Sequence, residues 1–239
     1  MKKTFKKIGW ILFMAFVLLV IPRLAGLFAD QFNYASIDPD GAFAWISIHH
    51  IVQGLLLLPV MLILARIKNY KFGFTLGYKK IGLYFVRIFA IVFSIYIIIS
   101  LIIVYFAETF NAFPYPLTAR NILGQLGFQL FLSGPSEELI FRAVAITMLS
   151  LYVKGSFFNG KLSNANIIAA IIFGLAHVRF IFVPFSMDYD PFQLVYAAGL
   201  GLAYGICYER SKSMIYPMIM HSMSNVIAVG VSIIAGFIL

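Results

Sequence analysis

Long apolar runs, separated by short polar segments, cover most of the chain. The runs span residues 8–29, 44–65, 83–106, 122–153, 166–182, 191–208 and 214–239. Several of them approach or exceed the ~20 residues that a helix needs to cross a lipid bilayer. They are continuous rather than alternating, which disfavours a transmembrane barrel. The pattern predicts an all-α fold, a polytopic transmembrane helical bundle of about seven spans that forms one integral membrane domain over residues 1–239.

Composition supports this class. Hydrophobic residues make up 62% of the 239 residues and the mean hydropathy is +0.95, whereas a soluble domain is about half apolar. The only cysteine, Cys207, excludes an intrachain disulfide and a structural cysteine cluster. Four lysines precede the first run, as in a secretory signal peptide, but the residues before Asp30 lack the small side chain of a good cleavage site. We therefore expect a retained first helix, interrupted at Pro22-Arg23.

The net charge of +9 is distributed as expected for a membrane protein and does not indicate a nucleic-acid partner. Most lysines and arginines lie at the N-terminus and in residues 66–80, 154–165 and 209–213, whereas the intervening polar segments are acidic. The positive-inside rule then places the N-terminus in the cytoplasm and the C-terminus outside. An eight-span alternative splits the 122–153 run at Gly134-Pro135, where proline predicts a kink or a break. It fits the loop charges less well.

The most informative polar stretch lies inside the 122–153 run. Charged residues at membrane depth are costly and usually serve a function. Glu138 and Arg142 are four residues apart and can pair on one helix face, which leaves Glu137, about 100° away, to point elsewhere. A purely structural alternative has both carboxylates neutralising Arg142 and other buried cations, such as Arg23 or Arg87.

The positions of the histidines favour the functional interpretation. His177 lies in the 166–182 run, and His221 lies in the last run, where Asn225 follows on the same helix face. A single buried histidine is more often a hydrogen-bonded structural residue than a catalytic one. Two histidines on different predicted helices, together with an intramembrane pair of glutamates, favour a functional site. The remaining pair, His49-His50, adjoins the start of the second helix without a patterned partner, and we expect it to be interfacial or structural.

A stripe of small residues marks the sixth run. Ala197, Gly201 and Gly205 are spaced four apart. Small residues at this spacing let a neighbouring helix approach closely. The stripe therefore predicts a tight helix contact.

Three segments together resemble a known family. In chain order, these are Glu137-Glu138-x-x-x-Arg142, Phe173-x-x-x-His177 and His221-x-x-x-Asn225. They are similar to the three motifs of the CPBP family of intramembrane proteases, which includes CAAX prenyl endopeptidases and Abi-like bacterial proteins linked to peptide processing and bacteriocin immunity. The resemblance covers a protease-like core of about residues 120–235. The first three helices carry no matching motif.

The resemblance implies an intramembrane endopeptidase. Peptide hydrolysis needs an activated water and a stabilised oxyanion. By resemblance, Glu137 is the general base and acts on the water with His177, while His221 and Asn225 donate hydrogen bonds to the oxyanion. Supporting roles fall to Glu138, Arg142 and Phe173.

A metal site is the open alternative for water activation. Glutamate and histidine also bind zinc, so Glu137, His177 and His221 are candidate ligands. The chain lacks the His-Glu-x-x-His arrangement of common metalloproteases. Proteins of the family have been described both as metalloproteases and as metal-independent glutamate proteases. We expect no metal cofactor, with zinc as the alternative.

Two other functions compete with the protease. A transporter would use the intramembrane charges as an ion path, but the halves show no inverted repeat. The second competing function is that of a catalytically silent scaffold or regulator of the same fold. The intact motif residues argue against this function. The expected partners of the protease are membrane lipid and a membrane-associated peptide or protein precursor.

Overall fold

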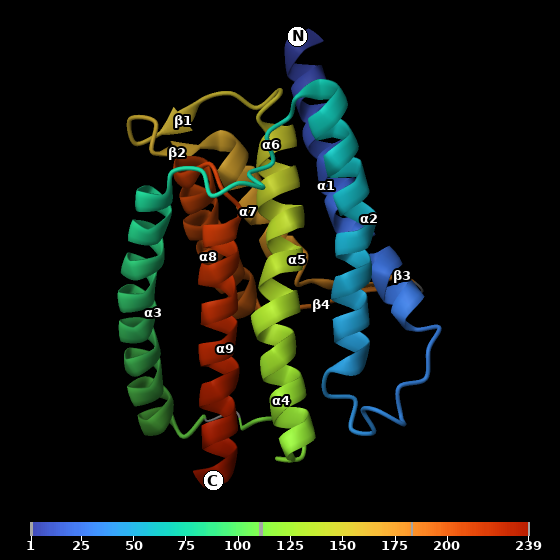
Figure 1. Ribbon diagram of the computed structural model, residues 1–239, viewed down its shortest axis with the longest axis vertical. Coiled ribbons are helices and arrows are strands. Elements are labelled where there is room, and N and C mark those ends of the chain that lie inside the picture. The colour runs from blue at the N-terminus through green and yellow to red at the C-terminus, as the bar shows by residue number, and fades with distance from the viewer. Residues whose placement is uncertain (1, 110–111, 183, 239) are drawn as a thin grey trace.

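The computed structural model is an elongated bundle of helices with the chain ends at opposite ends of the bundle (Figure 1). It describes residues 2–109, 112–182 and 184–238. The helices are α1 (Lys2–Ala29), α2 (Ala44–Lys68), α3 (Lys79–Ala107), α4 (Ala119–Phe128), α5 (Gly134–Glu138), α6 (Ala145–Leu149), α7 (Asn164–Leu175), α8 (Pro191–Ser211) and α9 (Ile215–Ile238). Two π-helical segments, η1 (Gln129–Ser133) and η2 (Leu139–Val144), lie between α4, α5 and α6.

The predicted class of helical membrane protein is confirmed. Among the described residues, α1, α2, α3 and α9 are long and apolar enough to cross a membrane. In contrast, α7 has only 12 residues, about 18 Å of helix against a hydrocarbon core of about 30 Å. The count of seven spans therefore stays a prediction.

The run from 122 to 153 is one helical rod rather than two pieces. The segments α4, η1, α5, η2 and α6 follow one another without a gap from 119 to 149 and form one column in Figure 1. Pro135 lies at the start of α5, directly after the π turn of η1. Because proline lacks an N–H and crowds the preceding turn, the wider π turn accommodates it. The kink or break predicted at Gly134-Pro135 takes the form of this local widening, and the helix continues through it.

The predicted helix over 166–182 is wrong in its second half. α7 ends at Leu175, and an antiparallel hairpin of β3 (Arg179–Phe182) and β4 (Phe185–Asp188) follows. A short apolar segment rich in aromatic and β-branched residues fits a strand as well as a helix, and periodicity does not separate them. His177 consequently lies in the turn after α7 instead of inside a helix. Its backbone N–H donates a hydrogen bond to the Gly174 carbonyl oxygen.

The predicted small-residue contact is confirmed between α7 and α8. A methyl group on Gly201 would lie 3.1 Å from the Phe173 ring, and one on Gly205 would overlap the Asn166 amide. Ala197 is buried in the same row. Glycine at these positions lets the two backbones approach, and this contact sets the position of Phe173.

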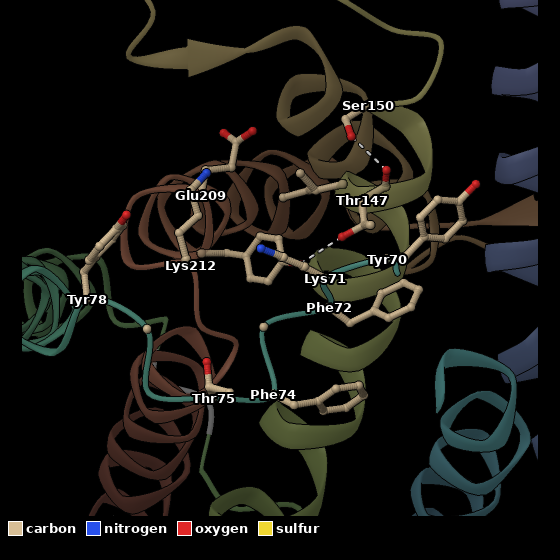
Figure 2. A pocket seen from close by; sticks show the side chains of 14 residues that line it. Tyr70, Lys71, Phe72, Phe74, Thr75, Tyr78, Thr147, Ser150, Glu209 and Lys212 are labelled. Carbon is tan, nitrogen blue, oxygen red and sulfur yellow. Dashed lines mark hydrogen bonds between the residues drawn. The ribbon is translucent and has the colours of Figure 1, made fainter. Parts of the chain in front are cut away.

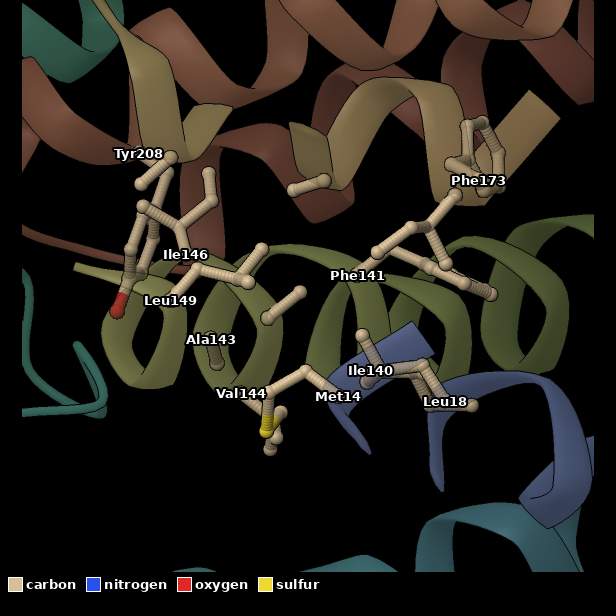
Figure 3. Packing of buried hydrophobic residues seen from close by; sticks show 14 of the residues in the cluster. Met14, Leu18, Ile140, Phe141, Ala143, Val144, Ile146, Leu149, Phe173 and Tyr208 are labelled. Carbon is tan, nitrogen blue, oxygen red and sulfur yellow. The ribbon is translucent and has the colours of Figure 1, made fainter. Parts of the chain in front are cut away.

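The main apolar core surrounds the rod. Figure 3 shows Ile140 and Val144 of the rod against Met14 and Leu18 of α1, with Phe173 of α7 on another side. In a membrane, such contacts stabilise through close packing rather than through exclusion of water. The rod is therefore held from several sides along the stretch that carries its charges.

The basic segments gather at one end of the bundle. Figure 1 shows the N-terminus, the 69–78 connection and a short hairpin of β1 (Ser156–Phe157) and β2 (Leu162–Ser163) at that end. The acidic 30–43 loop lies near the other end, as does the C-terminus. This grouping agrees with the alternating loop charges, while the cytoplasmic orientation of the N-terminus remains a prediction.

Candidate active site

The rod presents two adjacent carboxylates in different surroundings. Glu138 is 0% exposed and its Oε2 lies 3.0 Å from Nε of Arg142, itself 1% exposed. The pair predicted from the spacing of four residues is thus formed. Glu137, by contrast, keeps 19% of its side chain accessible. Since an isolated buried charge is very costly, the ion pair explains how Glu138 and Arg142 are accommodated, and Glu137 is left as the reachable carboxylate.

Two aromatic rings complete the surroundings of Arg142. Its guanidinium carbon lies 4.3 Å from the centroid of the Phe173 ring and 5.3 Å from that of Tyr204. Its two terminal nitrogens are buried and make no hydrogen bond within the described residues. A guanidinium over aromatic faces is stabilised by the ring quadrupoles. The motif residue Phe173 therefore supports the charge that fixes Glu138.

His221 on α9 joins the two carboxylates. Its Nδ1 lies 2.8 Å from Oε1 of Glu138, and its Nε2 lies 3.7 Å from Oε2 of Glu137. An ionised carboxylate only accepts hydrogen bonds, so Nδ1 carries the hydrogen and donates it to Glu138. The Tyr204 ring stacks on the imidazole at 5.0 Å. Glu138 and Tyr204 together fix the orientation of the ring.

Gly134 allows α9 to reach this position. A methyl group there would lie 2.8 Å from the backbone nitrogen of Ser222 and 3.2 Å from Cβ of His221. The first distance is too short for a side chain, so glycine is required where the rod and α9 touch.

Asn225 follows His221 by one helical turn. Its amide Nδ2 donates to Oγ of Ser133 over 3.0 Å. Ser133 precedes Glu137 by four residues, and the bond therefore places the Asn225 amide beside the same part of the rod.

Comparison with known proteins identifies the segment that carries this geometry. Residues 119–227 match the family model of the type II CAAX prenyl endopeptidase Rce1-like proteins. Residues 119–227 are an Rce1-like domain. Neither a search of curated proteins nor a search of solved structures found a match. The domain begins with α4 and ends two residues after Asn225, so it includes all three motifs. For this part of the chain, the match supports a CAAX-type intramembrane protease in general.

One buried histidine near Glu137 comes from outside the Rce1-like domain. His50 of α2 is 6% exposed, and its Nε2 lies 3.8 Å from Oε1 of Glu137. Its Nδ1 lies 2.7 Å from Oγ of Ser136 and 2.9 Å from Nε2 of Gln53. The Gln53 amide nitrogen is a donor, so Nδ1 accepts and the ring hydrogen is on Nε2, directed at Glu137.

Sequence reasoning missed this group. The buried ring of His50 agrees with the structural place expected for it, but the sequence did not indicate that the ring lies beside Glu137. The available signal was local: His50 and Gln53 are three residues apart, which puts two polar side chains on one face of an apolar helix. Their partner, Ser136, is 86 residues from His50 along the chain, and no local pattern indicates that contact.

His177 is connected to the cluster less directly. Its exposed ring lies edge-on to Phe173 with centroids 5.1 Å apart, and its Nδ1 lies 2.9 Å from the Phe173 carbonyl oxygen. Phe173 also contacts the His221 ring, with centroids 5.9 Å apart. Within the described residues, no ion pair or hydrogen bond joins His177 to Glu137. The fold therefore brings Glu137, Glu138 and His221 together and places His177 on their border.

The three candidate zinc ligands do not form one cluster among the described residues. In the part of the chain that the structure describes, no three His, Cys, Asp or Glu side chains are arranged to hold a metal ion. Of the candidates, His221 uses Nδ1 for Glu138, and the His177 ring contacts Phe173. The expectation that the protein works without a metal stays a prediction.

Proposed function

We propose that this protein is an intramembrane endopeptidase that hydrolyses a peptide bond in a membrane-associated peptide or protein precursor. The supporting observation is the pair of distances around Glu137. The one accessible carboxylate of the cluster lies between His50 and His221, next to a fully buried ion pair. The membership of residues 119–227 in a protease family supports the same reaction class.

In this proposal Glu137 is the general base. Its oxygens lie 3.8 Å and 3.7 Å from the two imidazole nitrogens, which is longer than a direct hydrogen bond. The carboxylate lone pairs are therefore free to accept a hydrogen bond from water and then its proton. The Nε2 hydrogen of His50 is directed at the same carboxylate from 3.8 Å, which leaves room for the water between them.

The oxyanion of the tetrahedral intermediate would form beside α9. The Asn225 amide has two N–H groups, and the bond to Ser133 uses one of them. The other is available to the oxyanion, and a donor of this kind typically contributes 10²–10³-fold to the rate. His221 lies one turn away on the same helix face and is the second proposed group; because Nδ1 donates to Glu138, it would donate to the oxyanion from Nε2, as the imidazolium. His177 helps to hold the water; this role is supported by the Phe173-x-x-x-His177 motif rather than by a contact with Glu137.

The substrate class follows from the surroundings of the site. The catalytic carboxylate lies on the rod within the bundle, and the loops of the chain are short. A substrate is therefore read within the bilayer or at its edge. A peptide precursor, such as a pheromone or bacteriocin leader, is the proposed class.

The test compares peptides from cells that express the wild-type protein, Glu137→Gln or Glu108→Gln. Glu108 is exposed at the end of α3 and provides the same chemical change away from the site. Secreted and membrane peptides are quantified by mass spectrometry at matched protein levels. The proposal requires a defined cleavage product that disappears in Glu137→Gln alone. If all three peptide profiles agree and Glu137→Gln still rescues a deletion phenotype, the protein is a scaffold.

A further inference from the structure

A large cavity lies at the basic end of the bundle, away from the candidate active site. It encloses about 920 Å³ between the 69–78 connection, the end of the rod and the α8–α9 turn (Figure 2). Its charged lining residues are Lys71, Lys212 and Glu209. Thr147 on its wall is ten residues beyond Glu137 on the rod, about 15 Å along a helix. The cavity is therefore a separate site.

The wall formed by the 69–78 connection is held in place by contacts within the protein. The Gly73 carbonyl accepts from the backbone N–H of Met214 over 2.9 Å, and the N–H of Tyr78 donates to the Ser211 carbonyl over 2.7 Å. Gly73 has a φ of +75°, and a methyl group on it would lie 3.0 Å from the Tyr208 ring. The side chain of Phe72 is buried beneath the connection. These contacts pin the connection to the α8–α9 turn, so the cavity does not depend on a ligand for its shape.

The lining carries one net positive charge, which suits a monoanion. Lys71 and Lys212 come from different walls (Figure 2), and Glu209 offsets one of the two positive charges. All ion pairs found among the described residues lie at the Glu137 cluster, so neither lysine has a carboxylate within 4 Å. One net positive charge is balanced by a phosphodiester, which carries one negative charge. Tyrosine and threonine hydroxyls in the same lining supply further hydrogen-bond donors.

The place of the cavity matches the level of lipid headgroups. The segments that line it lie at the ends of the helices, on the side where the lysine-rich segments gather. Its aromatic lining residues, including Tyr70, Phe74 and Tyr78, are of the kind enriched at the membrane–water boundary. Basic pockets between helices at this level bind anionic headgroups. We propose that the cavity binds the phosphodiester headgroup of an anionic phospholipid, with Lys71 and Lys212 as the phosphate ligands. This site does not rest on the proposed protease activity.

The experiment measures binding of phosphatidylglycerol to the full-length protein in detergent by native mass spectrometry. Lys71→Ala/Lys212→Ala is compared with Lys6→Ala/Lys161→Ala, which removes two exposed lysines outside the lining. We expect the first variant to bind about 25-fold more weakly, at roughly fivefold per lysine, and the control to change less than about twofold. Glu137→Gln binds like the wild type. Equal losses in both double variants, or no loss in the first, would overturn the proposal.

Two further arms identify the ligand. Millimolar inorganic phosphate is added as competitor: failure to displace the lipid supports a headgroup site, and full displacement overturns it in favour of free phosphate. A photoactivatable phosphatidylglycerol is also cross-linked to the wild-type protein, which requires no folded variant. Adducts within residues 70–78 or 208–212 support the site, whereas adducts confined to the outer face of α3 contradict it.

Discussion

His221 donates from Nδ1 to Glu138 over 2.8 Å while its Nε2 lies 3.7 Å from Glu137. The two adjacent carboxylates therefore have different tasks. Glu138 is committed to Arg142 and His221 and has no accessible surface, whereas Glu137 is partly accessible. One carboxylate orients the imidazole, and the other is left to react.

Replacing each glutamate separately tests this division. Glu138→Gln leaves the Arg142 charge buried without its partner, and we expect a loss of about 3–5 kcal/mol of stability. Glu137→Gln changes stability little, because this side chain is partly accessible, but abolishes cleavage. Unfolding of both variants in the same detergent gives the comparison. Similar unfolding temperatures for the two variants would contradict the assignment.

The two neighbouring histidines of α2 provide a matched pair. His50→Gln removes the ring directed at Glu137, and we expect cleavage to fall about 10²-fold, at the low end of general acid–base contributions. His49→Gln makes the same change at the preceding residue. The His49 ring stacks on Trp45, with ring centroids 5.3 Å apart. This variant should retain cleavage within a few fold. Initial cleavage rates on the identified substrate are measured for both variants. Equal losses of rate would mean that the substitutions act by disturbing the structure of α2 and not through His50.

Gly134 offers a steric test of the contact between the rod and α9. Gly134→Ala places a methyl group 2.8 Å from the Ser222 backbone and must displace His221, so we expect cleavage to be lost. Gly127→Ala adds the same methyl group elsewhere on the rod, where nothing lies within 4 Å, and it should be neutral or stabilising by up to about 1 kcal/mol. Cleavage that persists in Gly134→Ala would show that the position of His221 is not critical.

Local spacing predicted the parts of the structure that depend on neighbours within one element. The Glu138–Arg142 pair follows from a separation of four residues, and the Gly201–Gly205 contact follows from the same repeat. Helix length and hydropathy gave the long membrane helices of the bundle. Each of these features follows from the regular spacing of residue types along a single helix, which can be read from the sequence.

The rest depends on contacts between distant segments. His50 acquires its importance from Ser136 and Glu137, which lie on another element. The end of α7 was missed because residues 176–182 are apolar enough for a helix, while their pairing with 185–188 makes part of them a strand. At Pro135 the sequence predicted a kink or a break but not a π turn, because a proline signals lost hydrogen bonding but not how the helix adapts.

Chelation tests water activation without a metal. The proposed reaction uses Glu137 as base and protein hydrogen-bond donors, so cleavage by the purified protein should stay within about twofold after treatment with 1,10-phenanthroline or EDTA and removal of the chelator. A zinc protease assayed in parallel must lose its activity under the same conditions. Loss of cleavage that is restored by added zinc would replace the proposed mechanism by a zinc-dependent one.

Asp38 gives a prediction of pH dependence outside the membrane-spanning segments. Its carboxylate accepts hydrogen bonds from the backbone N–H groups of Ala42, Phe43 and Ala44, at 2.7–2.8 Å, where α2 begins. Burial alone would raise the pKa of Asp38, but these three donors and the charge of Arg120 outweigh it, and the pKa is lowered from its ordinary value of 3.8. Asp38→Asn should therefore cost about 1–2 kcal/mol at neutral pH.

The sign follows from the lowered pKa. A carboxylate with a lower pKa in the folded state stabilises fully above the pKa of the unfolded chain, about 4, and loses that contribution as pH falls through the folded-state value. The difference in unfolding free energy between the wild type and Asp38→Asn should be constant from pH 7 to about pH 5 and shrink below about pH 4. This pH dependence is tested by measuring unfolding of the wild type and Asp38→Asn across this range. Asp188→Asn, on the exposed strand β4, is the control. A difference that grows as the pH falls would contradict the role of ionised Asp38 as the hydrogen-bond acceptor at the start of α2.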